Sequence, residues 1–102
     1  MLMELTIIPL GQGRSISGNI ADLVKIIEDS RLDYRTTAFG TLVEGSWDQI
    51  VALAKECHFT ARNKTERVLT MIRIDDYGKR VGEIEGAVSR VEQKLGRAVK
   101  KS

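Results

Sequence analysis

A threonine and a glutamate stand inside a short, extended-looking segment framed by two glycines, in the stretch FGTLVEGSW at residues 39–47. Thr41 offers a hydroxyl and Glu44 a carboxylate, and together these groups can bind an amino group or a cation. Because side chains alternate along a strand, residues three apart point to opposite faces. The two groups can therefore line one pocket only if a bulge at Gly40 or Gly45 intervenes, or if two subunits supply one each.

If copies of the chain associate and shield Glu44 from water, its carboxylate needs a partner, because an unpaired buried carboxylate is costly. Three kinds of partner fit the sequence: Arg73 of the same chain, the backbone of a neighbouring subunit, or the amino group or cation of a ligand. The sequence leaves the structural and the ligand-binding role of Glu44 equally open.

The other reactive side chains favour structural roles. Cys57 and His58 are the only cysteine and histidine, so they can neither form an internal disulfide nor complete a metal site. Asp75 and Asp76 would point to opposite faces of a strand, and such a pair is typical of the turn that ends it. We therefore expect no catalysis, no bound metal and no cofactor.

Length and composition indicate one soluble domain. The chain has 102 residues, of which 42% are hydrophobic and 29% charged. Three basic residues lie among the last six, and removing them changes the formal charge from +2 to about −1, which argues against nucleic-acid binding. We expect a single domain over residues 1–96 and a basic, frayed tail over residues 97–102. The lone cysteine, with no secretion leader and no membrane-length apolar run, favours the cytoplasm.

The apolar periodicity predicts the element order β-α-β-β-α-β-α. The expected strands cover residues 3–11, then two short strands within 33–45 that reverse near residues 38–40, and finally 67–75. The first helix should follow a cap at Ser15 or Ser17, the second should run from Ser46 to about Thr60, and the third begins near Ile84. This order predicts an α+β, ferredoxin-like βαββαβ sandwich: a four-stranded antiparallel sheet with two helices on one face, and an extra C-terminal helix.

The last predicted strand carries large apolar side chains on both faces. One face has Val68, Thr70, Ile72 and Ile74, and the other has Arg67, Leu69, Met71 and Arg73. Two helices can cover only one face of the sheet, so Leu69 and Met71 need a cover from the third helix or from a second copy of the chain. Burying each such side chain is worth roughly 1.5–3 kcal/mol, so we expect a homo-oligomer.

Three strings in the sequence carry a resemblance to a known family. IIPLG in the first strand, FGTLVEGSWDQI in the middle and IRIDD at the end of the last strand resemble the small thiamine-binding protein family in order and spacing. The resemblance covers roughly residues 3–95, and its most specific part is GTLVEG joined to the Ile-Asp-Asp ending. It implies a ferredoxin-like fold, dimers that pair as tetramers, and binding of thiamine or its hydroxymethylpyrimidine half, without catalysis.

On that expectation the segment around Gly40 forms part of a ligand site. Thr41 and Glu44 could satisfy the donors and acceptors of the aminopyrimidine, and the carboxylate would favour the positive thiazolium. The flat rings need apolar walls, and the candidates are Ile7, Leu42 and Met71. The start of the first helix, near Arg14 and Ser15, could bind a phosphate, although an ordinary connecting turn is the commoner role of such a segment.

Two other functions stay open on the sequence alone. An amino-acid-binding regulatory domain shares the strand order, and a small dimeric sandwich enzyme could enclose an aromatic substrate. RNA recognition is excluded because the first strand has no aromatic residue on which a base could stack. Metal-carrying domains of this fold place paired cysteines in the first loop, where this chain has GQGRS.

Overall fold

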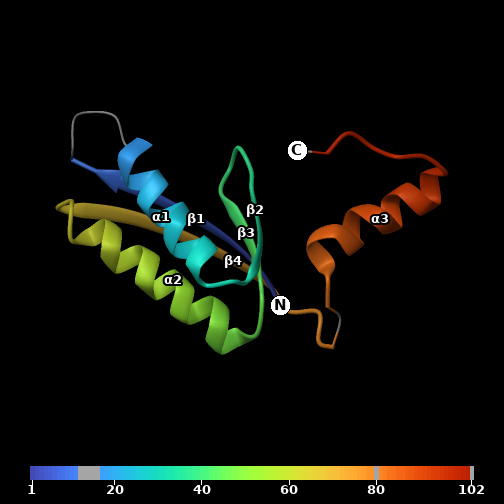
Figure 1. Cartoon of the computed structure of the whole chain (residues 1–102), viewed down its shortest axis with the longest axis horizontal. Helices are drawn as coiled ribbons and strands as arrows, with labels where there is room; N and C mark the ends of the chain where they lie inside the picture. Colours follow the sequence, from blue (N-terminus) through green and yellow to red (C-terminus); the bar gives the residue numbers. More distant parts are fainter. Residues whose placement is uncertain (12–16, 80, 102) are drawn as a thin grey trace.

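We describe the protein from a computed structural model, and the residues described are 1–11, 17–79 and 81–101 (Figure 1). Seven elements follow one another in the predicted order: β1 (Leu2–Leu10), α1 (Ser17–Asp29), β2 (Asp33–Thr36), β3 (Thr41–Glu44), α2 (Trp47–Arg62), β4 (Arg67–Asp75) and α3 (Glu83–Leu95).

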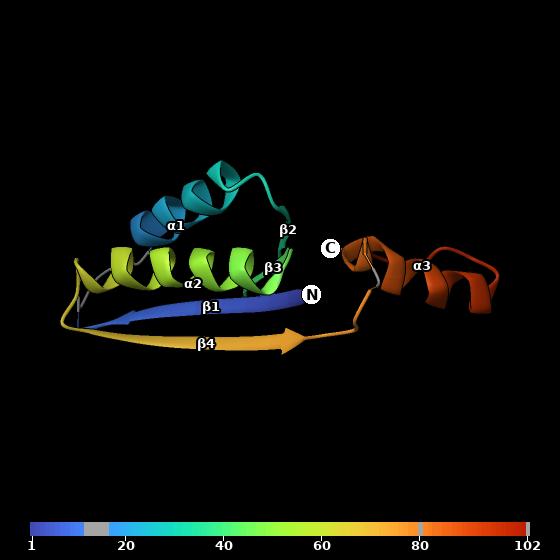
Figure 2. The ribbon, with the colours of Figure 1, turned by 90° about the horizontal axis from the view of Figure 1, so that it is seen from below.

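The four strands form one antiparallel sheet in the order β2-β3-β1-β4. Both α1 and α2 lie on the same face of this sheet (Figure 2). The predicted α+β, ferredoxin-like sandwich is therefore confirmed. None of the described helices has the length and apolar character that a membrane crossing would require.

The hydrophobic core lies between the sheet and these two helices. Every second side chain of a strand points to this side of the sheet, and the apolar residues of α1 and α2 repeat about every 3.6 positions. These two sets of side chains pack against each other. The most buried members are Met3, Leu5, Ile27, Val43, Ile50, Leu53, Ala54, Cys57 and Ala61.

Ser46 starts α2 with a reciprocal pair of hydrogen bonds. Its hydroxyl accepts the N–H of Gln49, and the Gln49 side chain accepts the N–H of Ser46, which forms a capping box. The predicted cap is thus confirmed, and the helix ends at Arg62, two residues beyond the expected end.

The long strand β1 has different neighbours on its two sides. Residues Leu2–Leu10 pair with β4 along their whole length, whereas only Leu2–Leu5 pair with β3. Because β3 begins at Thr41, the part of β1 beyond Leu5 has no strand on that side within the described residues. The second half of β1 therefore has an unpaired edge on its β3 side, next to α1.

The face of the sheet away from α1 and α2 is only partly covered. α3 contacts β3 and β2 and extends beyond the end of the sheet (Figures 1 and 2). Leu69 and Met71 remain 45% and 46% exposed. The alternation of side chains along β4 therefore leaves apolar groups in water, as its sequence predicts.

The segment after α3 turns back and contacts that helix. Gly96 ends the helix in the left-handed region, with φ of 72°, which glycine adopts without strain. The N–H of Val99 donates to Glu92 at 2.8 Å, and Lys101 forms an ion pair with the same carboxylate.

Candidate functional site

An apolar pocket of about 240 Å³ lies between α1, β1 and the turn that joins β2 to β3. It is found where β1 continues beyond the start of β3. Its apolar lining includes Ile7 and Ile8 from β1, and Leu23, Val24 and Ile27 from α1. The pocket therefore offers flat, aliphatic walls of the kind that hold a ring.

Threonine hydroxyls lie along the lining of this pocket. Thr36, Thr37 and Thr41 all contribute to it from the β2–β3 hairpin. Thr41 is buried, with 8% of its surface exposed, and within the described part of the chain its hydroxyl has no hydrogen-bond partner. That hydroxyl can donate to a ligand or accept from one.

The backbone of Ile7 adds a second unpaired polar group. Met1 and Gly45 exchange both of their main-chain hydrogen bonds, and in an antiparallel ladder such pairs recur at every second residue. Leu5, opposite Thr41, belongs to this series, so Ile7 is the next residue that turns its N–H and C=O to the β3 side.

Phe39 would stand opposite Ile7 if the ladder continued. The Phe39 carbonyl instead accepts the hydroxyl of Thr6 at 2.7 Å, and its N–H donates to Thr37 Oγ1 at 3.2 Å. Among the described residues, the N–H and C=O of Ile7 therefore have no partner. One donor and one acceptor lie side by side at the pocket, as in an unpaired strand edge.

Gly40 allows the hairpin to leave the ladder at this point. A Cβ atom at position 40 would lie 2.5 Å from Thr6 Oγ1 and 2.7 Å from the carbonyl oxygen of Leu5. Any side chain there would collide with the backbone of β1, so glycine is required for the close approach. The Thr37 hydroxyl holds the turn, because it donates to the Gly40 carbonyl at 3.0 Å.

Cys57 lies among the residues that line the pocket, on its α2 side. Burial raises the pKa of its thiol to about 11, and the charge of Glu56 adds to the effect. At neutral pH the thiol is therefore protonated and a poor nucleophile. Across the described residues, no three His, Cys, Asp or Glu side chains gather into a metal site.

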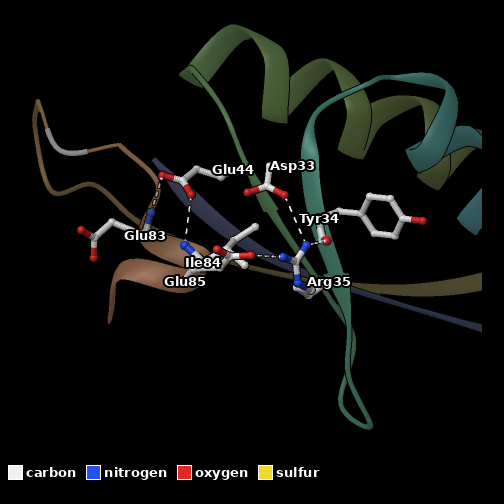
Figure 3. A network of polar contacts seen from close by, with 7 residues as sticks. All are labelled: Asp33, Tyr34, Arg35, Glu44, Glu83, Ile84 and Glu85. Carbon is white, nitrogen blue, oxygen red and sulfur yellow. Dashed lines mark hydrogen bonds and ion pairs between the residues drawn. The ribbon is translucent and has the colours of Figure 1, made fainter. Parts of the chain in front are cut away.

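Glu44 lies on the other face of the sheet, at the start of α3 (Figure 3). Its Oε2 accepts the hydroxyl of Tyr77 at 2.6 Å and the N–H of Glu83 at 2.9 Å, and its Oε1 accepts the N–H of Ile84 at 3.1 Å. The suggested partner Arg73 is wrong, because the Arg73 guanidinium pairs with Glu4 at 2.8 Å.

These contacts set the protonation of Glu44. Burial acts to raise the pKa of its carboxyl, but the hydrogen bonds from Glu83, Tyr77 and Ile84 outweigh burial and lower that pKa below its ordinary value. The positive N-terminus of the chain acts in the same direction. Glu44 is therefore an ionised cap for the first N–H groups of α3.

A second hollow, of about 570 Å³, lies between α3, the C-terminal segment and the outer face of β2 and β3. Several of its charged residues already pair with one another. Arg35 contacts Asp33 and Glu85 (Figure 3), and Lys101 pairs with Glu92. Among the charged side chains that line this hollow, only Lys100 has no ion-pair partner within the described residues.

The structure brings together three of the residues expected at the site and separates three others from them. Ile7, Gly40 and Thr41 line the pocket, and Arg14 and Ser15 lie outside the described residues. The remaining three, Leu42, Glu44 and Met71, lie on the opposite face of the sheet.

Sequence reasoning missed three residues: Thr36 and Thr37, which line the pocket beside α1, and Tyr77, which contacts Glu44. Thr36 and Thr37, directly before the expected turn, could have been found as hydroxyls next to Gly40. The Tyr77 partner of Glu44 had no signal in the sequence, since 33 residues separate the two.

Comparison with known proteins gives consistent matches over most of the chain. The model of a family described as thiamine-binding protein matches residues 3–92. UPF0045 protein MJ1052 of Methanocaldococcus jannaschii is 34% identical over 85 residues, which are 83% of this chain and 85% of that protein. UPF0045 protein YqgV of Bacillus subtilis is 32% identical over 100 residues, covering 92% and 96%.

A solved structure supports the fold. The crystal structure of MJ1052 matches with a TM-score of 0.77 at 33% identity, and the match covers 93% of this chain and 94% of that one.

Proposed function

The chain belongs to the thiamine-binding protein family, and from this premise we propose that it binds thiamine, or the hydroxymethylpyrimidine half alone, in the pocket beside α1. One observation carries the proposal. The hydroxyl of Thr41 and the N–H and C=O of Ile7 stay unpaired within the described residues, beside aliphatic walls. A polar-edged aromatic ring satisfies both features.

The size and charge of the pocket support the pyrimidine ring as the buried part. Its volume of about 240 Å³ falls below the roughly 300 Å³ at which pockets for larger ligands begin. The described lining holds no charged side chain, so a neutral ring is favoured over the cationic thiazolium. The thiazolium of bound thiamine would then lie at the mouth of the pocket, in contact with water.

Hydrogen bonding supports the orientation of this ring. An aminopyrimidine presents a donor beside an acceptor on one edge, and the C=O and N–H of Ile7 offer the complementary pair. The Thr41 hydroxyl can serve a second ring nitrogen. Such hydrogen bonds distinguish the aminopyrimidine from similar rings. An analogue that lacks one of its polar groups would leave a shielded group of the protein without a hydrogen bond.

Binding rather than catalysis fits the pocket. Cys57 is its one titratable side chain among the described residues, and the raised pKa keeps that thiol protonated. An amino-acid ligand, the alternative for a regulatory domain, would need charged partners for its ammonium and carboxylate groups. The described lining supplies none, so we expect amino acids to bind weakly.

Self-association belongs to the same proposal. Leu42 and Met71 lie on the partly uncovered face of the sheet, and a second copy packed there would bury them as a dimer or tetramer. Glu44 would then lie at the edge of that contact. We place this assembly in the cytoplasm, where Cys57 stays reduced. Light scattering at micromolar concentration should give a mass above that of one chain, and a stable monomer would contradict this part.

Titration calorimetry tests the ligand. Thiamine and hydroxymethylpyrimidine should both bind, whereas the thiazole half and a panel of amino acids should not. Thr41→Val keeps the shape of the side chain and removes the hydroxyl, so it should weaken binding at least about fivefold. Thr60→Val makes the same change on α2, outside the pocket, and should leave binding unchanged. No heat from either pyrimidine ligand at high micromolar concentration would overturn the proposal.

A further inference from the structure

The floor and the mouth of the pocket beside α1 are lined by different residues. Leu5, Ile27 and Cys57 are buried and form the floor, whereas Phe39 lines the same pocket with 84% of its surface exposed. A residue that both lines a pocket and faces water lies at its mouth. Single exposed apolar residues are common on protein surfaces, so the position of this ring matters more than its exposure.

The backbone of Phe39 is held at both of its polar groups. Its carbonyl accepts the hydroxyl of Thr6 from β1, and its N–H donates to the hydroxyl of Thr37. The Cα atom of Phe39 therefore keeps its place beside β1, while the exposed ring has few neighbours that restrict its rotamer. Such a ring can turn toward the pocket once a ligand has entered.

Phe39 is the one aromatic residue in the described lining of the pocket, and that lining holds no charged side chain. A cation at the mouth would therefore meet no carboxylate from the lining. The face of a phenyl ring attracts a cation through its quadrupole, and it also stacks on a flat ring. The chemistry of this mouth thus suits a ligand group that is both flat and positively charged.

We propose that the Phe39 ring closes over the thiazolium of bound thiamine and holds it by a cation–π contact. The inference rests on the proposed function and adds a specificity determinant to it. Ile7 and Thr41 contact the pyrimidine half, which thiamine and hydroxymethylpyrimidine share. Phe39 contacts only the half that is unique to thiamine. The pocket therefore prefers thiamine to hydroxymethylpyrimidine, although its floor treats the two ligands alike.

Titration calorimetry of Phe39→Leu tests the contact. Leucine keeps an apolar side chain and removes the aromatic face, so the affinity for thiamine should fall roughly three- to tenfold. The affinity for hydroxymethylpyrimidine should stay within about twofold of the parent, because this ligand does not reach the mouth. Phe39→Trp should bind thiamine more tightly than the parent, since indole gives the strongest cation–π contact.

Phe59→Leu is the matched control. It removes the other phenyl ring of the chain, which is also exposed but lies on α2 and does not line this pocket. Both affinities should stay at the parental values in this variant. Thermal melts of Phe39→Leu should also match the parent, because so exposed a ring adds little to the core. A loss of thiamine affinity would then not reflect a loss of fold.

A neutral isostere of thiamine separates charge from shape. In this ligand a carbon atom replaces the thiazolium nitrogen, so the size and flatness of the ring are kept and its positive charge is lost. Phe39→Leu should weaken the isostere less than it weakens thiamine. An equal loss for the two ligands would indicate an apolar cover alone and would overturn the cation–π contact. An equal loss for hydroxymethylpyrimidine and thiamine would overturn it as well.

Thr41→Val distinguishes this inference from the proposed function. It should weaken thiamine and hydroxymethylpyrimidine by the same factor, because both ligands present the pyrimidine ring to Thr41. If the parent binds both ligands and Phe39→Leu binds thiamine as tightly as the parent does, only the role of Phe39 is wrong. If the parent binds neither ligand, the proposed function fails and this inference fails with it.

Discussion

The carboxylate of Glu44 accepts the hydroxyl of Tyr77 at 2.6 Å, although the two residues are 33 positions apart. The same carboxylate accepts two N–H groups at the start of α3, where the N-cap residue, Gly82, has no side chain to offer. Strand β3 thus supplies the cap that the helix lacks. Glu44 therefore holds the start of α3 to β3, while the ion pair between Arg35 and Glu85 holds the same helix to β2.

Glu44→Gln should weaken the attachment of α3 and make it insensitive to acid. The folded protein has a lowered pKa at Glu44, so its stabilising effect is present above the unfolded value of 4.5 and is lost as the pH falls through the folded value. In the parent protein, the NMR signal of the Ile84 N–H should therefore shift as the pH falls below 4.5. In the variant that shift should vanish, and an unchanged acid titration would contradict the role of Glu44. Ligand affinity should stay within about twofold, since the side chain faces away from the pocket.

Tyr77→Phe should loosen α3 while keeping its helix. The change removes one hydrogen bond to an ionised carboxylate and should cost about 1 kcal/mol in the attachment of α3. Hydrogen exchange of the first α3 amides should become faster, while the amides of α2 keep their protection. Tyr34→Phe is the matched control, because within the described residues the Tyr34 hydroxyl has no partner. Equal exchange in the two variants would count against the contact.

Gly40→Ala and Gly86→Ala should change stability in opposite directions. The new methyl group at position 40 meets the Leu5 carbonyl at 2.7 Å, so we expect a loss of about 1–3 kcal/mol and a narrower pocket. At position 86 in α3 the nearest atoms lie 3.6 Å or more away, and alanine should stabilise the helix by about 0.5–1 kcal/mol. Thermal melts of both variants, with ligand titration of Gly40→Ala, measure these effects. A Gly40→Ala protein with parental stability and affinity would contradict the close approach.

Cys57 should stay unreactive in the folded protein. Its side chain is fully buried and the pKa of its thiol is raised to about 11, so at pH 8 little thiolate forms. Ellman's reagent should therefore modify it slowly in buffer and rapidly in concentrated urea. Fast modification of the folded chain would show that the pocket wall opens far more than the packing around Cys57 suggests.

Much of the fold was predictable because the signals for it are local. Apolar spacing identified the helices, β-branched runs identified the strands, and Ser46 marked the start of α2 through its capping pattern. The separation of Thr41 from Glu44 onto opposite faces also followed from the two-residue period of a strand. Of the residues that the family resemblance suggested for a ligand site, Ile7, Gly40 and Thr41 line one pocket, and their role in binding stays a prediction.

The sequence by itself thus determined the order of the elements, the two apolar faces of β4 and the direction of each strand side chain, because each depends on neighbours a few residues apart. Only the tertiary structure decided that Tyr77 and α3 satisfy Glu44, and that α3 leaves most of the outer face uncovered. It also decided that β3 begins late enough to free the backbone of Ile7. These features depend on strand register and on packing between residues far apart in the chain, and a local sequence pattern does not predict such contacts.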